Sequence, residues 1–181
     1  MTNLRSTKTL ENLKSAFAGE SQACVKYLLY ASKAKDDGYV QLSNIFLETA
    51  HNEREHAKIW FKILNDGEIQ NTWVNLEDSV QSERTEWDKM YREFAEEAEN
   101  EGFFEIAYLF KYVAKIERDH CERFRSLLSS VKNDTVFKKD EKVEWKCSNC
   151  GHSFKSFNAP MICPVCKHPR AFFEVKAHNY G

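Results

Sequence analysis

The sequence predicts a mainly α-helical fold, a four-helix bundle followed by a small C-terminal β domain that a metal ion holds together. Apolar residues recur every three or four positions in four long segments, which is the pattern of helices with one buried face. The first proline is Pro160, so each of these segments can form one uninterrupted helix. Two Cys-x-x-Cys pairs near the C-terminus, Cys147–Cys150 and Cys163–Cys166, predict the small metal-binding domain.

The composition indicates a soluble globular chain without a charged macromolecular partner. Its 181 residues suffice for one domain and a small appendage, and 42% of them are hydrophobic. The net charge of -2 gives no electrostatic support for a nucleic-acid or membrane partner. No apolar run approaches the ~20 residues of a membrane span, and the polar start lacks the apolar core of a signal peptide. We therefore expect a cytoplasmic protein.

The four helices are expected at about 7–36, 39–65, 77–101 and 103–130. Gly38, Gly67 and Gly102 each follow polar residues. A glycine in the left-handed conformation often ends a helix, so we expect these three to mark helix ends. Short connections after the first and third helices predict two antiparallel hairpins.

The connection between the second and third helices, Asp66–Leu76, is longer. Its eleven residues could extend over about 40 Å at ~3.4 Å each. That is the length of a helix of about 26 residues at ~1.5 Å per residue. The connection can therefore cross the bundle from end to end, which predicts a ferritin-like bundle with a long crossover between helices 2 and 3 rather than an up-down bundle.

All four apolar stripes are interrupted near mid-helix by acidic residues or by an acid and a histidine. Burying a bare carboxylate is costly unless a partner neutralises it. The interrupting residues are Glu20 in the first helix, Glu53 and His56 in the second, Glu83 and Glu86 in the third, and Glu117 and His120 in the fourth. The spacing repeats, with 33 positions from Glu20 to Glu53 and 34 from Glu83 to Glu117. The two hairpins therefore look like copies related by a pseudo-twofold axis, with a metal site on it.

Two Glu-x-x-His pairs, with one glutamate from each remaining helix, form the ligand set of di-iron or di-manganese bundles. Carboxylates and imidazoles suit iron or manganese and do not exclude zinc. The alternative is a structural network in which buried glutamates pair with histidine, lysine or arginine. We favour metal because the acids and histidines fall at matching levels, whereas nearby lysines and arginines lie off the stripes.

The C-terminal part is expected to be a separate domain. We expect the bundle over 1–131, a charged linker over 132–144 and the small domain over 145–181. A domain of this size rarely folds on its hydrophobic core alone and needs a disulfide or a bound metal to stabilise it. In a reducing cytosol, the four cysteines Cys147, Cys150, Cys163 and Cys166 favour a metal over disulfides. A tetrahedral four-thiolate site holds zinc, as a structural clip, or a single iron, as a one-electron relay.

The chain resembles a rubrerythrin over essentially its whole length. The resemblance is carried by Ala18-Gly-Glu20-Ser-Gln22, Glu53-Arg-Glu-His56-Ala57, Glu83-Arg-Thr-Glu86 followed by Met90-Tyr91, Glu117-Arg-Asp-His120, and the segment Cys147–Cys166. A ferritin-like bundle followed by a rubredoxin-like domain is the order of ordinary rubrerythrins, not of the reversed form.

The resemblance implies a role for each of these residues. Glu53 and Glu117 would bridge two iron ions, Glu20 and Glu83 would be terminal ligands on opposite irons, and His120 would bind the second iron. The other iron would exchange Glu86, in the oxidised state, for His56, in the reduced state. Tyr27 and Tyr91 match tyrosines that hydrogen-bond at the site, and the four cysteines would hold a mononuclear iron.

The function that follows is a non-haem di-iron peroxidase, which reduces hydrogen peroxide to water in oxidative-stress defence. Electrons would come through the four-cysteine iron from an NAD(P)H-linked reductase or a separate rubredoxin. A head-to-tail homodimer is implied. The alternatives are an O₂-reducing oxidase or ferroxidase on the same scaffold, and a zinc-ribbon binding protein, which would be colourless.

Overall fold

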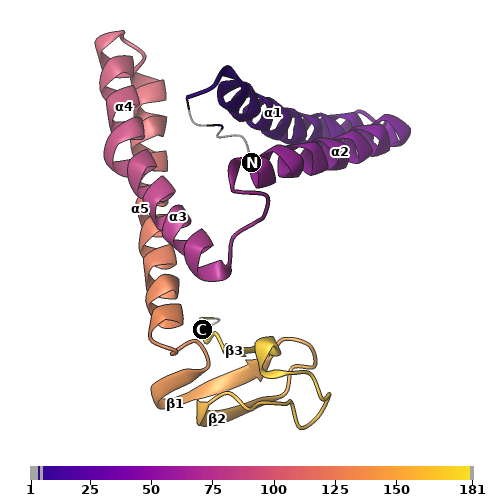
Figure 1. Ribbon diagram of the computed structural model, residues 1–181, viewed down its shortest axis with the longest axis vertical. Coiled ribbons are helices and arrows are strands. Elements are labelled where there is room, and N and C mark those ends of the chain that lie inside the picture. Colours follow the sequence, from indigo (N-terminus) through magenta and orange to yellow (C-terminus); the bar gives the residue numbers. More distant parts are fainter. Residues whose placement is uncertain (1–3, 5, 180–181) are drawn as a thin grey trace. The chain divides into compact units, whose positions relative to one another are not determined.

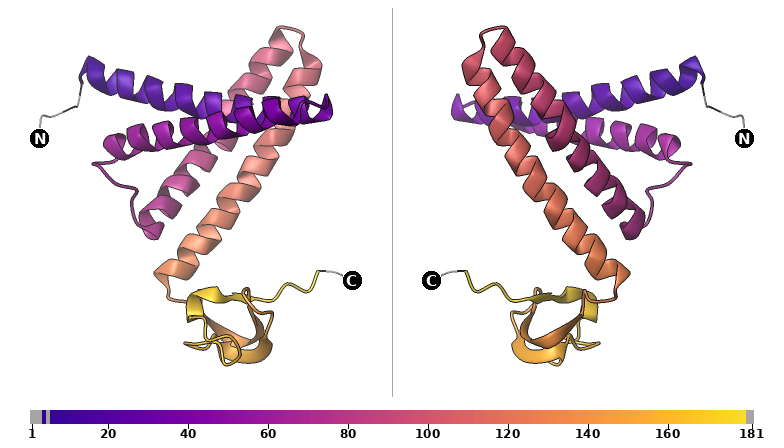
Figure 2. Two further views of the ribbon diagram at one scale, coloured as in Figure 1. Left: turned by 90° about the vertical axis from the view of Figure 1, so that its right-hand side faces the viewer. Right: turned by 90° about the vertical axis from the view of Figure 1, so that its left-hand side faces the viewer.

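The computed structural model describes residue 4 and residues 6–179. The predicted class is confirmed: the chain is mainly α-helical with a small C-terminal sheet (Figures 1 and 2). It divides into two compact units, Met1–Gln70 and Asn71–Gly181. In the part of the chain that the structure describes, every helix is too short or too polar to cross a membrane.

The first unit is an antiparallel hairpin of α1 (Lys8–Asp36) and α2 (Val40–Leu64), which lie side by side in Figure 1. The Thr7 hydroxyl caps α1 by accepting a hydrogen bond from the Leu10 N–H, at 3.2 Å. Small residues let the helices approach closely, since Ala31, Ala50 and Ala57 are all buried. The Ser43 hydroxyl, also buried, donates to the Ala31 carbonyl across the hairpin at 2.8 Å.

The segment that follows α2 is shorter than the sequence indicated. The N–H of Gly67, which has a φ of +98°, donates to the Lys62 carbonyl and ends the helix. The next helix, α3 (Thr72–Thr85), begins behind Asn71, whose side chain accepts from the Val74 N–H at 3.1 Å. The predicted start at residue 77 is therefore wrong by five residues, because the cap and not the apolar stripe determines where the helix begins. The connection is 65–71 rather than Asp66–Leu76.

The second unit begins with another helical hairpin. The third predicted helix, 77–101, is interrupted: α3 is followed by a π-helical turn, η1 (Glu86–Met90), and then by α4 (Tyr91–Asn100). The returning helix is α5 (Phe104–Lys132). Small residues again line the contact, with Ala95, Ala98, Ala107 and Cys121 buried.

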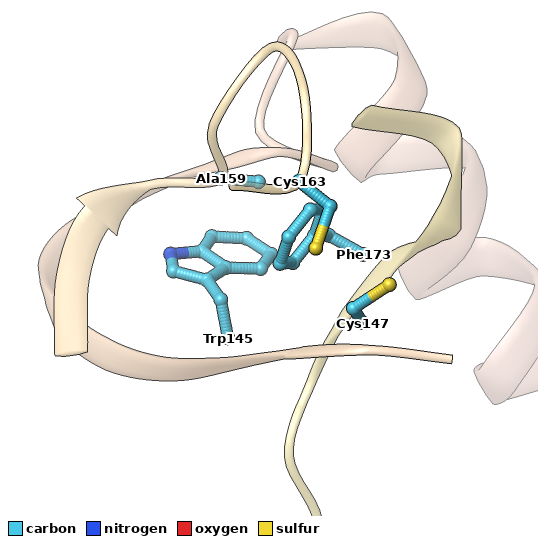
Figure 3. Packing of buried hydrophobic residues seen from close by; sticks show 5 residues of the cluster. All are labelled: Trp145, Cys147, Ala159, Cys163 and Phe173. Atoms are coloured by element: carbon cyan, nitrogen blue, oxygen red, sulfur yellow. The ribbon is translucent and has the colours of Figure 1, made fainter. Parts of the chain in front are cut away.

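The C-terminal domain is a three-stranded antiparallel sheet in the order β2-β1-β3. Its strands are β1 (Lys138–Cys147), β2 (Ser153–Asn158) and β3 (Phe173–Val175), and a single 3-10 turn, η2 (Arg170–Phe172), precedes β3. Residues 138–144, which we expected in a linker, belong to β1. The core consists of Trp145, Cys147, Ala159, Cys163 and Phe173, and the sulfurs of the two cysteines lie together at one edge of it (Figure 3).

Candidate metal centres

Three predicted ligands come together within the first hairpin. Glu20 lies near the middle of α1, and Glu53 and His56 lie one turn apart on the facing side of α2. The His56 Nδ1 atom is 2.9 Å from Glu53 Oε2 and 4.0 Å from Glu20 Oε2. We call these three residues the first ligand group.

The second hairpin repeats this arrangement with Glu83 of α3 and Glu117 and His120 of α5, which we call the second ligand group. The His120 Nδ1 atom is 2.7 Å from Glu117 Oε2 and 3.7 Å from Glu83 Oε2. In each group, the potential ligand atoms lie within 4.8 Å of one another. The internal repeat in the sequence therefore corresponds to two matching clusters.

The chemistry of each ligand group fits a metal ion such as iron. Two carboxylates and one imidazole are hard and borderline donors, which suit divalent iron or manganese. Burial raises the pKa of Glu83, and the neighbouring Glu117 raises it further, so a cation here would relieve the repulsion. Three protein ligands would leave coordination positions of a six-coordinate ion free for other ligands. The groups are also only partly enclosed within their own hairpins, since the His56 side chain is 51% exposed and that of His120 is 35% exposed.

The remaining predicted residues of the helical site, Glu86, Tyr91 and Tyr27, lie outside the two groups. Glu86 is the first residue of η1 and, among the described residues, lies outside both three-residue groups. It nonetheless acts on Tyr91, whose pKa is raised by burial and, to a smaller extent, by the Glu86 and Glu117 charges. The Tyr91 ring packs against that of Phe110, and the Tyr27 ring stacks on that of Phe46.

The π-helical turn was not predicted. Residues 86–90 read Glu-Trp-Asp-Lys-Met, a sequence with no proline, glycine or other helix breaker to reveal it. Such turns occur frequently at functional sites. The sequence marked this position only by a second glutamate on the same helix, Glu86, one turn after Glu83.

All four predicted cysteines come together in the C-terminal domain. Cys147 Sγ is 3.7 Å from Cys166 Sγ, and Cys150 Sγ is 3.7 Å from Cys163 Sγ. Four sulfurs placed tetrahedrally at ~2.3 Å from a metal would be separated from one another by about 3.8 Å. The cluster therefore already has the geometry of a four-thiolate metal site.

The two halves of this cluster have the same backbone conformation. The Cys147 N–H donates to the His152 carbonyl and the Cys163 N–H donates to the His168 carbonyl, both at 2.8 Å. The residue before each histidine is left-handed: Gly151 has a φ of 77° and Lys167 a φ of 64°. The sequence analysis missed both histidines, although each one follows its Cys-x-x-Cys pair at the same distance.

These turns direct backbone N–H groups at the sulfurs, as expected for metal-binding knuckles. The N–H of His168 lowers the pKa of Cys166, to about 5. The N–H of His152 acts in the same direction on Cys150, but burial and the other three thiols outweigh it and raise the pKa of Cys150 to about 12.

Helical carboxylate–histidine groups and a separate four-thiolate centre on one chain are typical of non-haem iron oxidoreductases. Comparison with known proteins agrees with this class. The chain matches the Rubrerythrin family over residues 11–128 and 74–156, and the rubrerythrin rubredoxin-like domain over residues 145–174. It is 45% identical to Rubrerythrin-1 of Clostridium acetobutylicum, over 99% of this chain and 100% of that one.

Other relatives cover similar lengths. The chain is 45% identical to the rubrerythrin of Clostridium perfringens, over 99% of this chain and 100% of that one. It is 40% identical to the rubrerythrin of Nitratidesulfovibrio vulgaris, again over 99% and 100%. The chain belongs to the rubrerythrin family, so its cofactors are a di-iron site and an iron in the four-cysteine site.

Proposed function

We propose that this protein is a non-haem di-iron peroxidase, in which hydrogen peroxide, two electrons and two protons give two molecules of water. The observation that carries this proposal is the presence on one chain of two matched carboxylate–histidine groups and a four-thiolate cluster. The first two can supply a site for two-electron chemistry, and the third can supply electrons one at a time.

The proposed ligand assignment gives the two groups unequal roles. Glu53 and Glu117 would be shared by the two irons, Glu20 and Glu83 would each hold one iron, and His120 would bind the second iron. The other iron would be held by Glu86 in the oxidised state and by His56 in the reduced state. Two observations support the exchange: the His56 side chain is the more exposed of the two histidines, and Glu86 lies on a turn that has no counterpart in the first hairpin.

The proposed reaction also needs groups that hold protons. When bound, the two irons supply electrons to the O–O bond and act as Lewis acids. The Tyr91 phenol, whose raised pKa keeps it protonated, is proposed to donate a hydrogen bond at the site. Tyr27, at the matching level of the first hairpin, takes the corresponding role. The carboxylates accept and return protons.

The C-terminal four-cysteine domain is proposed to return electrons to the di-iron site of another subunit in a head-to-tail homodimer. The external donor would be an NAD(P)H-linked reductase or a separate rubredoxin. The same ligand groups would also suit an O₂-reducing oxidase or ferroxidase. The four-thiolate cluster favours the peroxidase over iron storage, because storage needs no built-in electron relay.

The proposal is tested by steady-state turnover of the iron-loaded protein with a reductase and NAD(P)H. We expect hydrogen peroxide to be consumed faster than O₂ at equal concentration, with two electrons used per peroxide. Faster turnover with O₂ would overturn the assignment in favour of the oxidase. Metal analysis and the visible spectrum of the same sample would show whether the four-cysteine site holds iron or zinc.

A further inference from the structure

We infer that each di-iron site is built from two copies of this chain: the N-terminal hairpin (α1–α2) of one copy pairs with the C-terminal hairpin (α3–α5) of the other. The inference rests on the di-iron site of the proposed function. It adds that the ligands of one site come from different chains, so neither chain alone can complete a site.

The length of the connection carries the inference. In a ferritin-like bundle the chain between the second and third helices runs along the length of the bundle. The 25 residues of α2 span about 37 Å at ~1.5 Å per residue. From Leu64 to Thr72 there are eight Cα–Cα steps, which reach at most about 29 Å when fully extended at ~3.6 Å each. The connection is therefore too short to place both hairpins of one chain in the same bundle.

The connection is also far from extended. The Gly67 N–H donates to the Lys62 carbonyl at 2.7 Å, and the Glu68 N–H donates to the Asn65 carbonyl at 3.4 Å. The Gln70 side chain donates to the same Asn65 carbonyl at 3.3 Å. Because the first part of the connection folds back on the end of α2, only about four residues remain to cover distance, or about 14 Å. Unwinding the first residues of α3 would lengthen the connection, but it would break the hydrogen bond by which Asn71 caps this helix.

Each hairpin also leaves large apolar side chains exposed. Within a hairpin the fully buried residues are almost all small, and many of the large apolar residues on the helices are exposed. Examples in the N-terminal hairpin are Leu28 at 49%, Leu42 at 48% and Ile63 at 41%. In the C-terminal hairpin, Ile106 is 46% and Leu127 49% exposed. Such faces need a helical partner, and the matching hairpin of a second copy provides one with the complementary ligand group.

The ligand groups show why the occupant is a second copy rather than an unrelated protein. Each group supplies two carboxylates and one histidine, so further ligands would be needed to complete a di-iron site. Among the described residues, the matching carboxylate–histidine group is the other group of this same chain, on its other hairpin. Exchange of hairpins between two copies completes two equivalent sites per dimer and leaves no hairpin unpaired.

The test uses dimers of two differently substituted chains. Chains carrying Glu53→Ala and chains carrying Glu117→Ala are co-expressed with different affinity tags, and the dimers are purified through both tags. If hairpins are exchanged, both substitutions fall in one site and the other site has all its ligands. We expect about half of the wild-type di-iron content, after the four-cysteine iron has been subtracted from its visible absorption. If each chain closes on itself, both sites are damaged and the iron content stays at the level of the single variants.

A mirror-image control reverses the expectation. In dimers of wild-type chain with the double variant Glu53→Ala/Glu117→Ala, exchange damages both sites, whereas closure within a chain leaves one intact. The pair Glu20→Ala and Glu83→Ala repeats the test in case either first variant misfolds. The reverse pattern, or no protein retained on both tags, would overturn the inference. A wild-type protein without di-iron content would instead refute the proposed function.

Discussion

The backbone N–H of Tyr91 donates a hydrogen bond to the carbonyl of Glu86, five residues earlier, so one π-helical turn joins α3 to α4. This turn begins at Glu86, the acid that breaks the symmetry of the predicted ligand set. It ends at Tyr91, whose pKa is raised by burial and, to a smaller extent, by the charge of Glu86. A wide turn costs some helical hydrogen-bond geometry, and retaining it at this position is consistent with a functional role for Glu86.

Replacing Glu86 by alanine should leave the fold intact and slow the reaction. The side chain lies outside both ligand groups, so its loss should not prevent them from forming. We expect peroxide turnover to fall about 10- to 100-fold, the range typical when a group that supports a metal site is removed. Asp88→Ala, in the same turn but with an exposed side chain, is the matched control. Equal turnover in both variants would show that Glu86 has no special role.

Tyr91→Phe should reduce turnover without affecting the packing. The ring keeps its contacts with Phe94 and Phe110, whereas the hydroxyl is lost. One hydrogen bond is worth about 1 kcal/mol, so we expect about a fivefold loss in kcat. The thermal unfolding midpoint should change little. Tyr39→Phe, at a position 61% exposed, controls for the general effect of losing a phenol. A loss of the same size in both variants would argue against a hydrogen bond at the site.

Local signals in the sequence were enough to predict most helix ends and both kinds of metal-binding cluster. The ends of α1 and α4 were predicted correctly from Gly38 and Gly102, because both glycines adopt the left-handed conformation that completes these caps. The Glu-x-x-His and Cys-x-x-Cys spacings brought their side chains together because each spacing lies within a single turn. Such features depend on neighbours along the chain, and a sequence pattern records them directly.

The features that were missed lack such a signal. The start of α3 at Thr72 was missed because the apolar stripe begins later, at Leu76, and Asn71 was not recognised as the cap. The first part of β1 was predicted to be a linker because 138–142 are all charged, and charged residues on an exposed strand resemble a linker. The exchange of hairpins proposed above was also missed, because a local sequence pattern does not record which chains meet.

Cys163→Ser should disconnect the external electron supply. Cys163 is buried in the core of the small domain and is one of the four clustered thiols. We expect the four-cysteine iron and its visible absorption to be lost and NAD(P)H-coupled turnover to stop, while the di-iron content stays near that of the wild type. Cys24→Ala, a helical thiol outside the cluster, should retain the four-cysteine iron. Coupled turnover that survived Cys163→Ser would rule out the relay.

Metal affinity of the four-cysteine site should rise with pH. In the metal-free domain, Cys166, with a pKa of about 5, is already a thiolate at pH 7, whereas Cys150, with a pKa of about 12, holds its proton. Binding a metal must displace that proton, so lowering the proton concentration favours the complex. Zn²⁺ titrations of the reduced, metal-free protein between about pH 6 and 8 should show at least about a tenfold gain in affinity per pH unit. A flat profile would mean that the thiols are already ionised.

Trp145→Ala should make folding of the C-terminal domain depend more strongly on its metal than in the wild type. Trp145 is fully buried, and its Nε1–H donates to the Ser156 carbonyl at 3.1 Å. Removing a buried tryptophan costs about 3–5 kcal/mol, which is comparable to the whole stability of a domain of about 40 residues. Limited proteolysis should therefore cleave the metal-free variant within the domain and spare the metal-bound form, because metal binding is coupled to folding. Val165→Ala, at a position 63% exposed in the same domain, should be cleaved no faster than the wild type in either state. If metal-free Trp145→Ala resisted equally, the indole would not be what supports this core.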